Sequence, residues 1–233
     1  MSQKEHSFVS YITVMHTAQA ADKIYSNDDF DDYTLLGGFF DPKNDDRLGW
    51  AKAGDAGGGS AGFYRYNRGA KQFILCFRGS AGSKDFTVDD VQIVRNISVD
   101  RVSDCIAYAK RVQAQNPGSF ILVAGHSLGG FLAQVVGVEC DMPFISYNAP
   151  GAGAYLSRTM RYRKFDRGVN FRINWDPVSR GVGNHVGPLI TLPHHGWKIW
   201  DAHMGVAYLQ SVERSAFKDN AAMAFITRQN MYR

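Results

Sequence analysis

The chain has 233 residues, of which 45% are hydrophobic and 21% charged, and its formal net charge is +4. These values are typical of a soluble globular protein, and because Lys and Arg are dispersed they indicate no nucleic-acid-binding module. No stretch approaches the roughly 18 consecutive apolar residues that a membrane span needs. The length predicts one domain over residues 1–233, large enough to bury a substantial core.

The cysteines and the first residues bear on the cellular compartment. Cys76, Cys105 and Cys140 each lie in an apolar context, which predicts buried free thiols rather than a disulfide scaffold. Residues 1–6 lead into no uninterrupted apolar core of the signal-peptide type. We therefore expect a protein made in the cytoplasm, with signal-independent export left open.

The first third of the chain combines one helix, turns and two strands. Apolar residues at helical spacing predict a helix over residues 8–24. Turn-rich segments follow at residues 39–49 and 54–62, the second of which is rich in glycine. Two strands joined by a turn are predicted at residues 63–66 and 72–77.

Helices and strands then alternate along the chain. They are predicted at residues 98–116, 120–124, 131–138, 143–147, 152–164 and 169–174. This alternation predicts an α/β fold with a mostly parallel central sheet covered by helices on both faces. In such a sheet, functional residues gather at the carboxyl ends of the strands.

The most specific motif is Gly-His-Ser-Leu-Gly-Gly at residues 125–130, between a predicted strand and a predicted helix. A sharp strand–turn–helix connection strains the backbone of Ser127 at its apex, so Gly125 and Gly129 stand where side chains would collide. The turn lifts the hydroxyl above the sheet, beside the N–H groups of the helix start. The motif predicts a nucleophile elbow with Ser127 as the nucleophile.

A serine nucleophile needs a base and a group that orients the base. Asp176 directly follows the predicted strand 169–174 and Trp175, which places its carboxylate at the active edge. His203 precedes an apolar helical stretch and is our candidate base, with His195 as the main alternative. The spacing of the late histidines matches no zinc pattern, and the serine already supplies a nucleophile, so we expect no metal.

The negative charge that develops on an attacked carbonyl oxygen needs preorganised N–H donors. The N–H of Leu128, next after the nucleophile, is one candidate donor. The second is expected in the loop after an earlier strand, where Ser80 follows Gly79.

Together these residues resemble the class 3 lipase family of α/β-hydrolases. The matching segments are Phe77-Arg78-Gly79-Ser80, Gly125-His126-Ser127-Leu128-Gly129-Gly130, Asn148-Ala149-Pro150-Gly151, Asp176-Pro177-Val178 and His203. The resemblance implies Ser127 as nucleophile, Asp176 as orienting acid, His203 as base, and Ser80 with Leu128 as the oxyanion hole. It also implies cofactor-free hydrolysis of acylglycerols or related carboxylic esters, transient contact with a lipid interface, and a candidate lid over residues 83–96.

The chain is more similar to short bacterial or phage-borne members of that family than to its secreted fungal members, because the secretion signal and disulfides of the fungal enzymes are missing. The resulting hypothesis is a serine carboxylic-ester hydrolase of lipase or esterase type that acts through an acyl-enzyme on Ser127. The alternatives are a phospholipase, thioesterase or acyltransferase using the same residues, or a non-catalytic binding protein with a hydrolase fold. The oligomeric state stays open.

Overall fold

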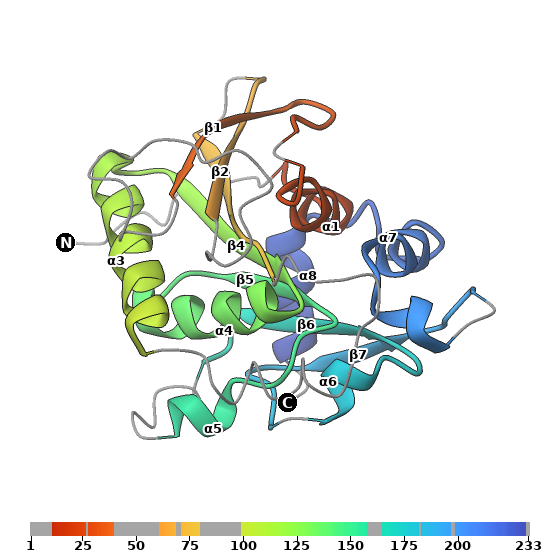
Figure 1. The fold of residues 1–233 in the computed structure, drawn as a ribbon. Coiled ribbons are helices and arrows are strands. Elements are labelled where there is room, and N and C mark those ends of the chain that lie inside the picture. The colour runs from red at the N-terminus through yellow and green to blue at the C-terminus, as the bar shows by residue number, and fades with distance from the viewer. Residues whose placement is uncertain are drawn as a thin grey trace.

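The fold is built on one mixed sheet (Figure 1). The computed structural model describes residues 11–26, 28–39, 61–68, 71–79, 99–157, 165–181, 183–196 and 199–231. These residues form a seven-stranded sheet in which the strand order follows the chain order, β1 to β7. The first three strands pair antiparallel, and each pairing from β3 to β7 is parallel. The predicted α/β class with a mostly parallel sheet is confirmed.

The elements have the following bounds. The strands are β1 Tyr33–Phe39, β2 Ala61–Tyr66, β3 Gln72–Phe77, β4 Phe120–His126, β5 Phe144–Tyr147, β6 Gly168–Ile173 and β7 Leu189–Leu192. The helices are α1 Val14–Lys23, α3 Val99–Gln115, α4 Leu128–Cys140, α5 Gly153–Leu156, α6 Pro177–Gly181, the 3-10 helix η2 Ile199–His203, α7 Gly205–Glu213 and α8 Ala222–Asn230.

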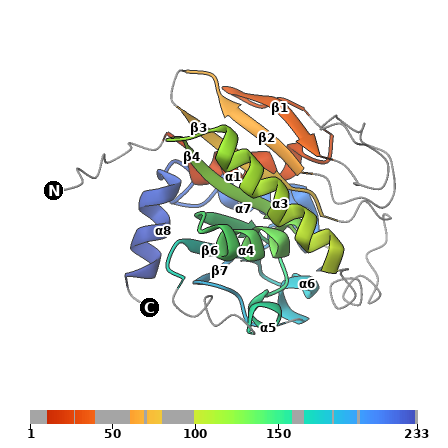
Figure 2. The same ribbon diagram turned by 90° about the vertical axis from the view of Figure 1, so that its left-hand side faces the viewer.

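The two faces of the sheet carry separate apolar cores. Successive side chains of a strand point to opposite faces, so Ile121 and Val123 of β4 join one core while Leu122 and Ala124 join the other. The first core contains residues of α3 and α4, and the second contains residues of α1, α7 and α8. Figures 1 and 2 show α3 and α4 on one side of the sheet, with α1 and α7 on the other. Burial on both faces explains why β3 and β4 are apolar runs without alternation.

Two predicted helices have different bounds in the structure. The helix predicted at residues 8–24 begins at Val14, because Thr13 caps it: the Thr13 Oγ1 accepts the His16 N–H, and His16 Nδ1 accepts the Thr13 N–H. The helix predicted at residues 152–164 is described only as the single turn α5, followed by a turn at Ser157. Residues 8–10 and 158–164 lie outside the described residues.

Five described elements were not predicted from the sequence, namely β1, β7, α6, η2 and α8. β1 is interrupted by a register shift between Leu35 and Gly37, and β7 is a four-residue strand with only Leu192 buried. β1 therefore lacks a regular pattern, and the apolar run of β7 is too short to indicate a strand. The glycine-rich segment predicted as a turn extends into β2 at residues 61–62, and its earlier residues lie outside the described part, as does the candidate lid at residues 83–96.

The prediction of buried free thiols is confirmed. Cys76, Cys105 and Cys140 are all buried and unpaired with one another. Burial raises the pKa of the Cys76 thiol, and it raises the pKa of Cys140 to about 11. Cys76 and Cys140 therefore act as small apolar core residues near neutral pH.

The longest described helix, α3, has 17 residues and a polar outer face. Across the described ranges, no helix has both the length and the apolar character needed to span a bilayer.

Candidate active site

Ser127 sits at the sharp connection between β4 and α4. Its backbone has a φ of 56°, in the left-handed region that a non-glycine residue rarely adopts. Its N–H donates to the Tyr147 carbonyl at 3.0 Å, which extends the β4–β5 pairing to the apex of the turn. A side chain on Gly125 would collide with the backbone of Gly129, and one on Gly129 would collide with the Phe77 carbonyl. The steric role predicted for these two glycines is confirmed.

Three side chains that are distant in sequence form one hydrogen-bonded chain. His203 Nε2 lies 2.9 Å from Ser127 Oγ, and His203 Nδ1 lies 2.8 Å from Asp176 Oδ1. Because a carboxylate oxygen accepts, Nδ1 carries the proton and Nε2 accepts the serine O–H. All three side chains are buried, with Asp176 wholly inaccessible to solvent. A hydroxyl, an imidazole and a carboxylate joined in this order can activate the hydroxyl as a nucleophile.

Asp176 is held by the start of α6 as well as by His203. Its Oδ1 accepts the N–H of Val178 at 3.2 Å, and its Oδ2 accepts the N–H of Ser179 at 3.1 Å. The Asp-Pro sequence therefore does act as a helix-capping turn, which is the structural role that such a sequence often has. The carboxylate caps the helix and contacts the imidazole at the same time, because it lies beyond the carboxyl end of β6.

The backbone around His203 is anchored by Asn148, which follows β5. The Asn148 amide donates to the Ala202 carbonyl at 2.8 Å and to the His203 carbonyl at 3.5 Å. Its Oδ1 accepts the N–H of Ile173, the last residue of β6, at 2.8 Å. Asn148 is fully buried and has a φ of 47°, a conformation that asparagine tolerates better than most residues. One side chain thus links the strand that leads to Asp176 with the segment that carries His203.

His126, the residue before the serine, is a second anchor of the same segment. Its Nε2 lies 2.7 Å from the His203 carbonyl, which can only accept, so Nε2 carries the proton. Its Nδ1 accepts the hydroxyl of Tyr25 at 3.1 Å, and that hydroxyl oxygen accepts the N–H of Gly79 at 3.2 Å. Burial, followed by the neighbouring His203, lowers the pKa of His126 to about 3. His126 is therefore neutral and structural at physiological pH.

These two anchors were not recognised as such from the sequence. Both stand inside motifs that were noticed, since His126 belongs to the elbow and Asn148 to the segment Asn-Ala-Pro-Gly. Their partners are 77 and 55 residues away in sequence, respectively. Spacing alone carries no signal for contacts of that range.

Of the two candidate oxyanion donors, Leu128 lies within the described residues. Leu128 is the first residue of α4, and the N–H groups of a helix's first turn have no partner within the helix. The loop after β3 approaches the elbow closely, since a Cβ on Gly79 would lie 3.2 Å from the Ser127 Cβ. Ser80, the other predicted donor, lies outside the described residues.

The remaining late histidines lie elsewhere. His195, the alternative base, is exposed, whereas His185 is half-buried with its Nε2 at 2.8 Å from the Ala149 carbonyl. Burial lowers the pKa of His185. Over the described part of the chain, no three His, Cys, Asp or Glu side chains are grouped so as to hold a metal ion.

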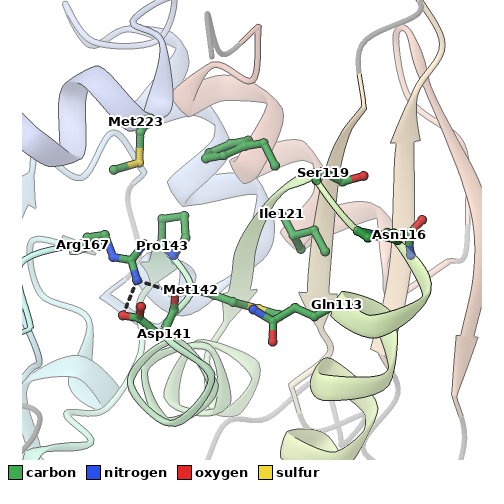
Figure 3. Close-up of a pocket in the computed structure, with 12 residues that line it drawn as sticks. Gln113, Asn116, Ser119, Ile121, Asp141, Met142, Pro143, Arg167 and Met223 are labelled. Carbon is green, nitrogen blue, oxygen red and sulfur yellow. Dashed lines mark hydrogen bonds and ion pairs between the residues drawn. The ribbon is translucent and has the colours of Figure 1, made fainter. Parts of the chain in front are cut away.

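A cavity of about 490 Å³ lies at the opposite end of β4 from Ser127. Figure 3 shows residues that line it. It opens beside the start of β4 and is lined in part by Phe120, Met142 and Met223. Arg167 on its wall pairs with Asp141. This cavity is separate from the Ser127 site, because the elbow stands at the other end of β4.

Comparison with known sequences gives a partial likeness. No model of a known protein family matches the chain. Over 125 residues it is 31% identical to the extracellular phospholipase A1 of Serratia liquefaciens. The aligned part covers 53% of this chain and 35% of the phospholipase, so the chain spans about a third of the curated relative that it matches.

Comparison with solved structures identifies the fold. The Lip2 lipase of Yarrowia lipolytica superposes with a TM-score of 0.51 at 16% identity, covering 76% of this chain and 77% of that chain. The triacylglycerol lipase of Penicillium expansum superposes with a TM-score of 0.51 at 18% identity, covering 77% and 79%. The strand–elbow–helix arrangement and these superpositions define an α/β-hydrolase fold. Within that class, the fold is similar to that of these two lipases.

Proposed function

We propose that this protein is a serine hydrolase of carboxylic esters, with Ser127 as nucleophile, His203 as general base and Asp176 as the group that orients the base. The observation that carries the proposal is the continuous hydrogen-bonded chain from Asp176 through His203 to Ser127. The lipase-like fold and the sequence likeness to a phospholipase A1 support the same reaction class. We propose that the ester belongs to a lipid, with the length of its acyl chain to be determined by the assay below.

The proposed reaction proceeds through an acyl-enzyme. His203 Nε2 takes the proton of the Ser127 hydroxyl as Oγ attacks the ester carbonyl carbon. Asp176 keeps the imidazole in the reactive tautomer and stabilises the imidazolium that forms. The negative charge on the carbonyl oxygen is placed near the Leu128 N–H, at the positive end of α4, with Ser80 proposed as the second donor.

Collapse of the tetrahedral intermediate breaks the bond from the carbonyl carbon to the alkoxide, which leaves as an alcohol after taking the proton from His203. A water molecule, deprotonated by the same imidazole, then attacks the acyl-enzyme. The carboxylic acid leaves and Ser127 regains its proton. No redox step or cofactor is needed, because protons and nucleophile are supplied by the chain and by water.

The partial likeness to a phospholipase A1 favours one substrate over the other esters, namely a glycerophospholipid. Thioester hydrolysis and acyl transfer to another acceptor use the same three residues and differ only in the leaving group or acceptor. Mass spectrometry of the products from a defined phosphatidylcholine, from an acyl thioester, and from the same phosphatidylcholine with an added alcohol acceptor separates the three reactions. A lysophospholipid and a free fatty acid in equal amounts would support phospholipid hydrolysis.

The nucleophile is tested with a fluorophosphonate probe and with p-nitrophenyl esters of graded chain length. We expect the probe to label Ser127 and the protein to hydrolyse the esters. Ser127→Ala should abolish labelling, and His203→Ala should lower kcat by at least about a thousandfold, as losses of such residues do. His195→Ala is the matched control, because His195 is exposed and should leave kcat within about twofold. A well-folded protein with neither labelling nor turnover would instead be a non-catalytic binding protein.

A further inference from the structure

The helix that follows the candidate base begins without a cap of its own. His203 ends η2, Met204 is the N-cap residue of α7, and Gly205 is the first residue of that helix. Met204 makes no capping hydrogen bond through its side chain, and the first turn of α7 contains no acidic residue. The N–H groups of Gly205 and Val206 have no hydrogen-bond partner among the described residues. A negative charge at this helix start is therefore favourable.

Asp22, near the end of α1, supplies that charge from another part of the chain. The helix α1 packs against α7, and the two lie side by side in Figure 1. The Asp22 carboxylate lies against the backbone of Gly205, because a Cβ on that glycine would be 2.6 Å from Asp22 Oδ1. A carboxylate from α1 thus stands at the uncapped start of the helix that follows His203.

The same contact explains why residue 205 is glycine. The φ of Gly205 lies outside the left-handed region, so the helical backbone by itself does not require glycine there. Alanine would favour the helix more than glycine does. Tyr208 would be at an ordinary contact distance of 3.8 Å from a Cβ at this position, whereas Asp22 Oδ1 would collide with it. Gly205 and Asp22 are therefore matched to each other.

The charge of Asp22 is retained at a cost in stability. Its side chain is half-buried and has no hydrogen bond or ion pair with the described residues. Burial raises the pKa of Asp22, and the neighbouring Lys23 lowers it. Tyr25, Tyr64 and Tyr208 lie within electrostatic range, and burial raises the pKa of each hydroxyl, so all three stay neutral. A charge that lowers stability is expected where activity depends on it.

We propose that Asp22 is a positioning residue for His203. Its carboxylate holds the start of α7, and the start of α7 holds the backbone that carries the imidazole two residues earlier. Asn148 and His126 anchor the same segment from the sheet and from the elbow. The inference rests on the proposed function, because it concerns the position of a base that takes a proton from Ser127.

Asp22→Asn removes the charge and keeps the shape of the side chain. We expect kcat for a soluble p-nitrophenyl ester to fall about 5- to 30-fold, with KM within about twofold, because the base is displaced while the substrate still binds. Since the charge lowers stability, Tm should stay at or above the wild-type value. A wild-type kcat in Asp22→Asn would overturn the inference. So would a loss of kcat explained by a matching loss of folded protein.

Glu213→Gln is the matched control. It removes an exposed carboxylate at the other end of the same helix, far from the start that Asp22 contacts. We expect kcat to stay within about twofold of wild type, as is usual for surface substitutions. An equal loss of kcat in Glu213→Gln would mean that any change of charge on α7 has this effect, and the role of Asp22 would be rejected.

Gly205→Ala tests the contact from its other side. The added methyl group displaces the Asp22 carboxylate, so kcat should fall about as far as in Asp22→Asn, although alanine favours the helix. In Asp22→Ala the space beside residue 205 is vacant. Adding Gly205→Ala to that variant should therefore lower kcat no further. Losses that simply multiply in the double variant would contradict the pairing of these two residues.

The ratio of the wild-type kcat to that of Asp22→Asn gives a readout that a purely structural role would not move. Titration of His203 affects both proteins and cancels in the ratio. As the pH falls, protonation of Asp22 removes the charge from the wild type, so the ratio should decline toward one. The decline should begin above the usual carboxyl pKa of 3.8, because burial raises the pKa of Asp22. A ratio that stays constant from pH 8.0 to pH 4.0 would show that the charge has no role.

The position of the imidazole is also measurable without turnover. The Nδ1 proton of His203 is bonded to Asp176 and should give a downfield NMR resonance. We expect Asp22→Asn to shift or broaden this resonance and Glu213→Gln to preserve it. A shifted resonance in a protein that hydrolyses no ester would keep the positioning role and reject the hydrolase. Ester hydrolysis at the wild-type rate in Asp22→Asn, with an unchanged resonance, would keep the hydrolase and reject the positioning role.

Discussion

At the scale of single residues, Asp176 combines two roles that are usually separate. Its carboxylate caps α6 through the N–H groups of Val178 and Ser179 while it contacts the His203 imidazole. Because it is fully buried, each of these bonds forms in a medium of low dielectric and is correspondingly strong. A substitution of Asp176 is therefore expected to lower the proposed catalytic rate and the stability of the fold by different amounts.

Asp176→Asn tests that separation. The amide keeps the shape of the carboxylate and one acceptor, so the protein should fold with a Tm reduced by only a few degrees. The orientation and tautomer of His203 would be lost, so we expect kcat for a p-nitrophenyl ester to fall by about 10⁴. Thermal unfolding and steady-state kinetics on one preparation check both values. A kcat within tenfold of wild type would contradict the role proposed for Asp176.

At the scale of elements, buried polar side chains link the strand ends at the candidate active site to η2. Asn148 joins the end of β6 to η2, and His126 joins the elbow to the same segment. Neither bond is part of a helix or a strand ladder. The position of His203 thus depends on these cross-links, because His203 is the last residue of a short 3-10 helix with little support of its own.

Asn148→Asp tests the cross-link. Aspartate tolerates the positive φ and keeps the acceptor for Ile173, but it lacks the donors to Ala202 and His203. We expect kcat to fall about 10- to 100-fold, the size of effect that small displacements of catalytic groups produce. Asn170→Asp makes the same change at a buried asparagine that bonds Ser146 and Val186 instead.

Both aspartate variants should lose stability, because each buries a charge. The kcat of each variant is therefore calculated per folded molecule, with the folded fraction determined by circular dichroism. A loss of kcat shared equally by the two variants would show that Asn148 acts only through stability.

At the scale of the whole molecule, buried histidines make folding sensitive to acid. His126 has an unperturbed pKa of 6.5 that the fold lowers to about 3. As pH falls through 6.5 the unfolded chain gains a proton at His126 that the folded chain does not, so stability is complete above about pH 6.5 and declines toward pH 3. The slope for this single group approaches about 1.4 kcal/mol per pH unit.

Urea unfolding at pH 7.5, 6.0 and 5.0 measures that slope. His126→Gln should be less stable than wild type at pH 7.5, because the anchor to His203 is altered. As the pH falls, its free energy of unfolding should decrease less steeply than that of wild type. The two slopes should differ by close to the contribution of one bound proton, about 1.4 kcal/mol per pH unit. Parallel slopes for wild type and His126→Gln would contradict a neutral, buried His126.

The amino-acid sequence by itself determined the α/β class and the elbow. Both have local signals: the alternation of apolar strands and helices is a property of short segments, and the collision between a side chain at Gly125 and the Gly129 backbone arises within one tight turn. The collision at Gly129 is with the Phe77 carbonyl of β3, which only the folded sheet brings near. The short or irregular strands β1 and β7 left no such local signal. Sequence spacing also left open whether His195 or His203 lies nearest the serine.

Only the tertiary structure decided which distant side chains meet at Ser127. His203 and Ser127 are 76 residues apart, and their contact depends on where η2 packs against α6 and α7. That packing in turn depends on buried bonds from Asn148 and His126, which no periodicity reveals. Contacts of this range arise from the folding of the sheet as a whole, because the chain must close long loops before they form.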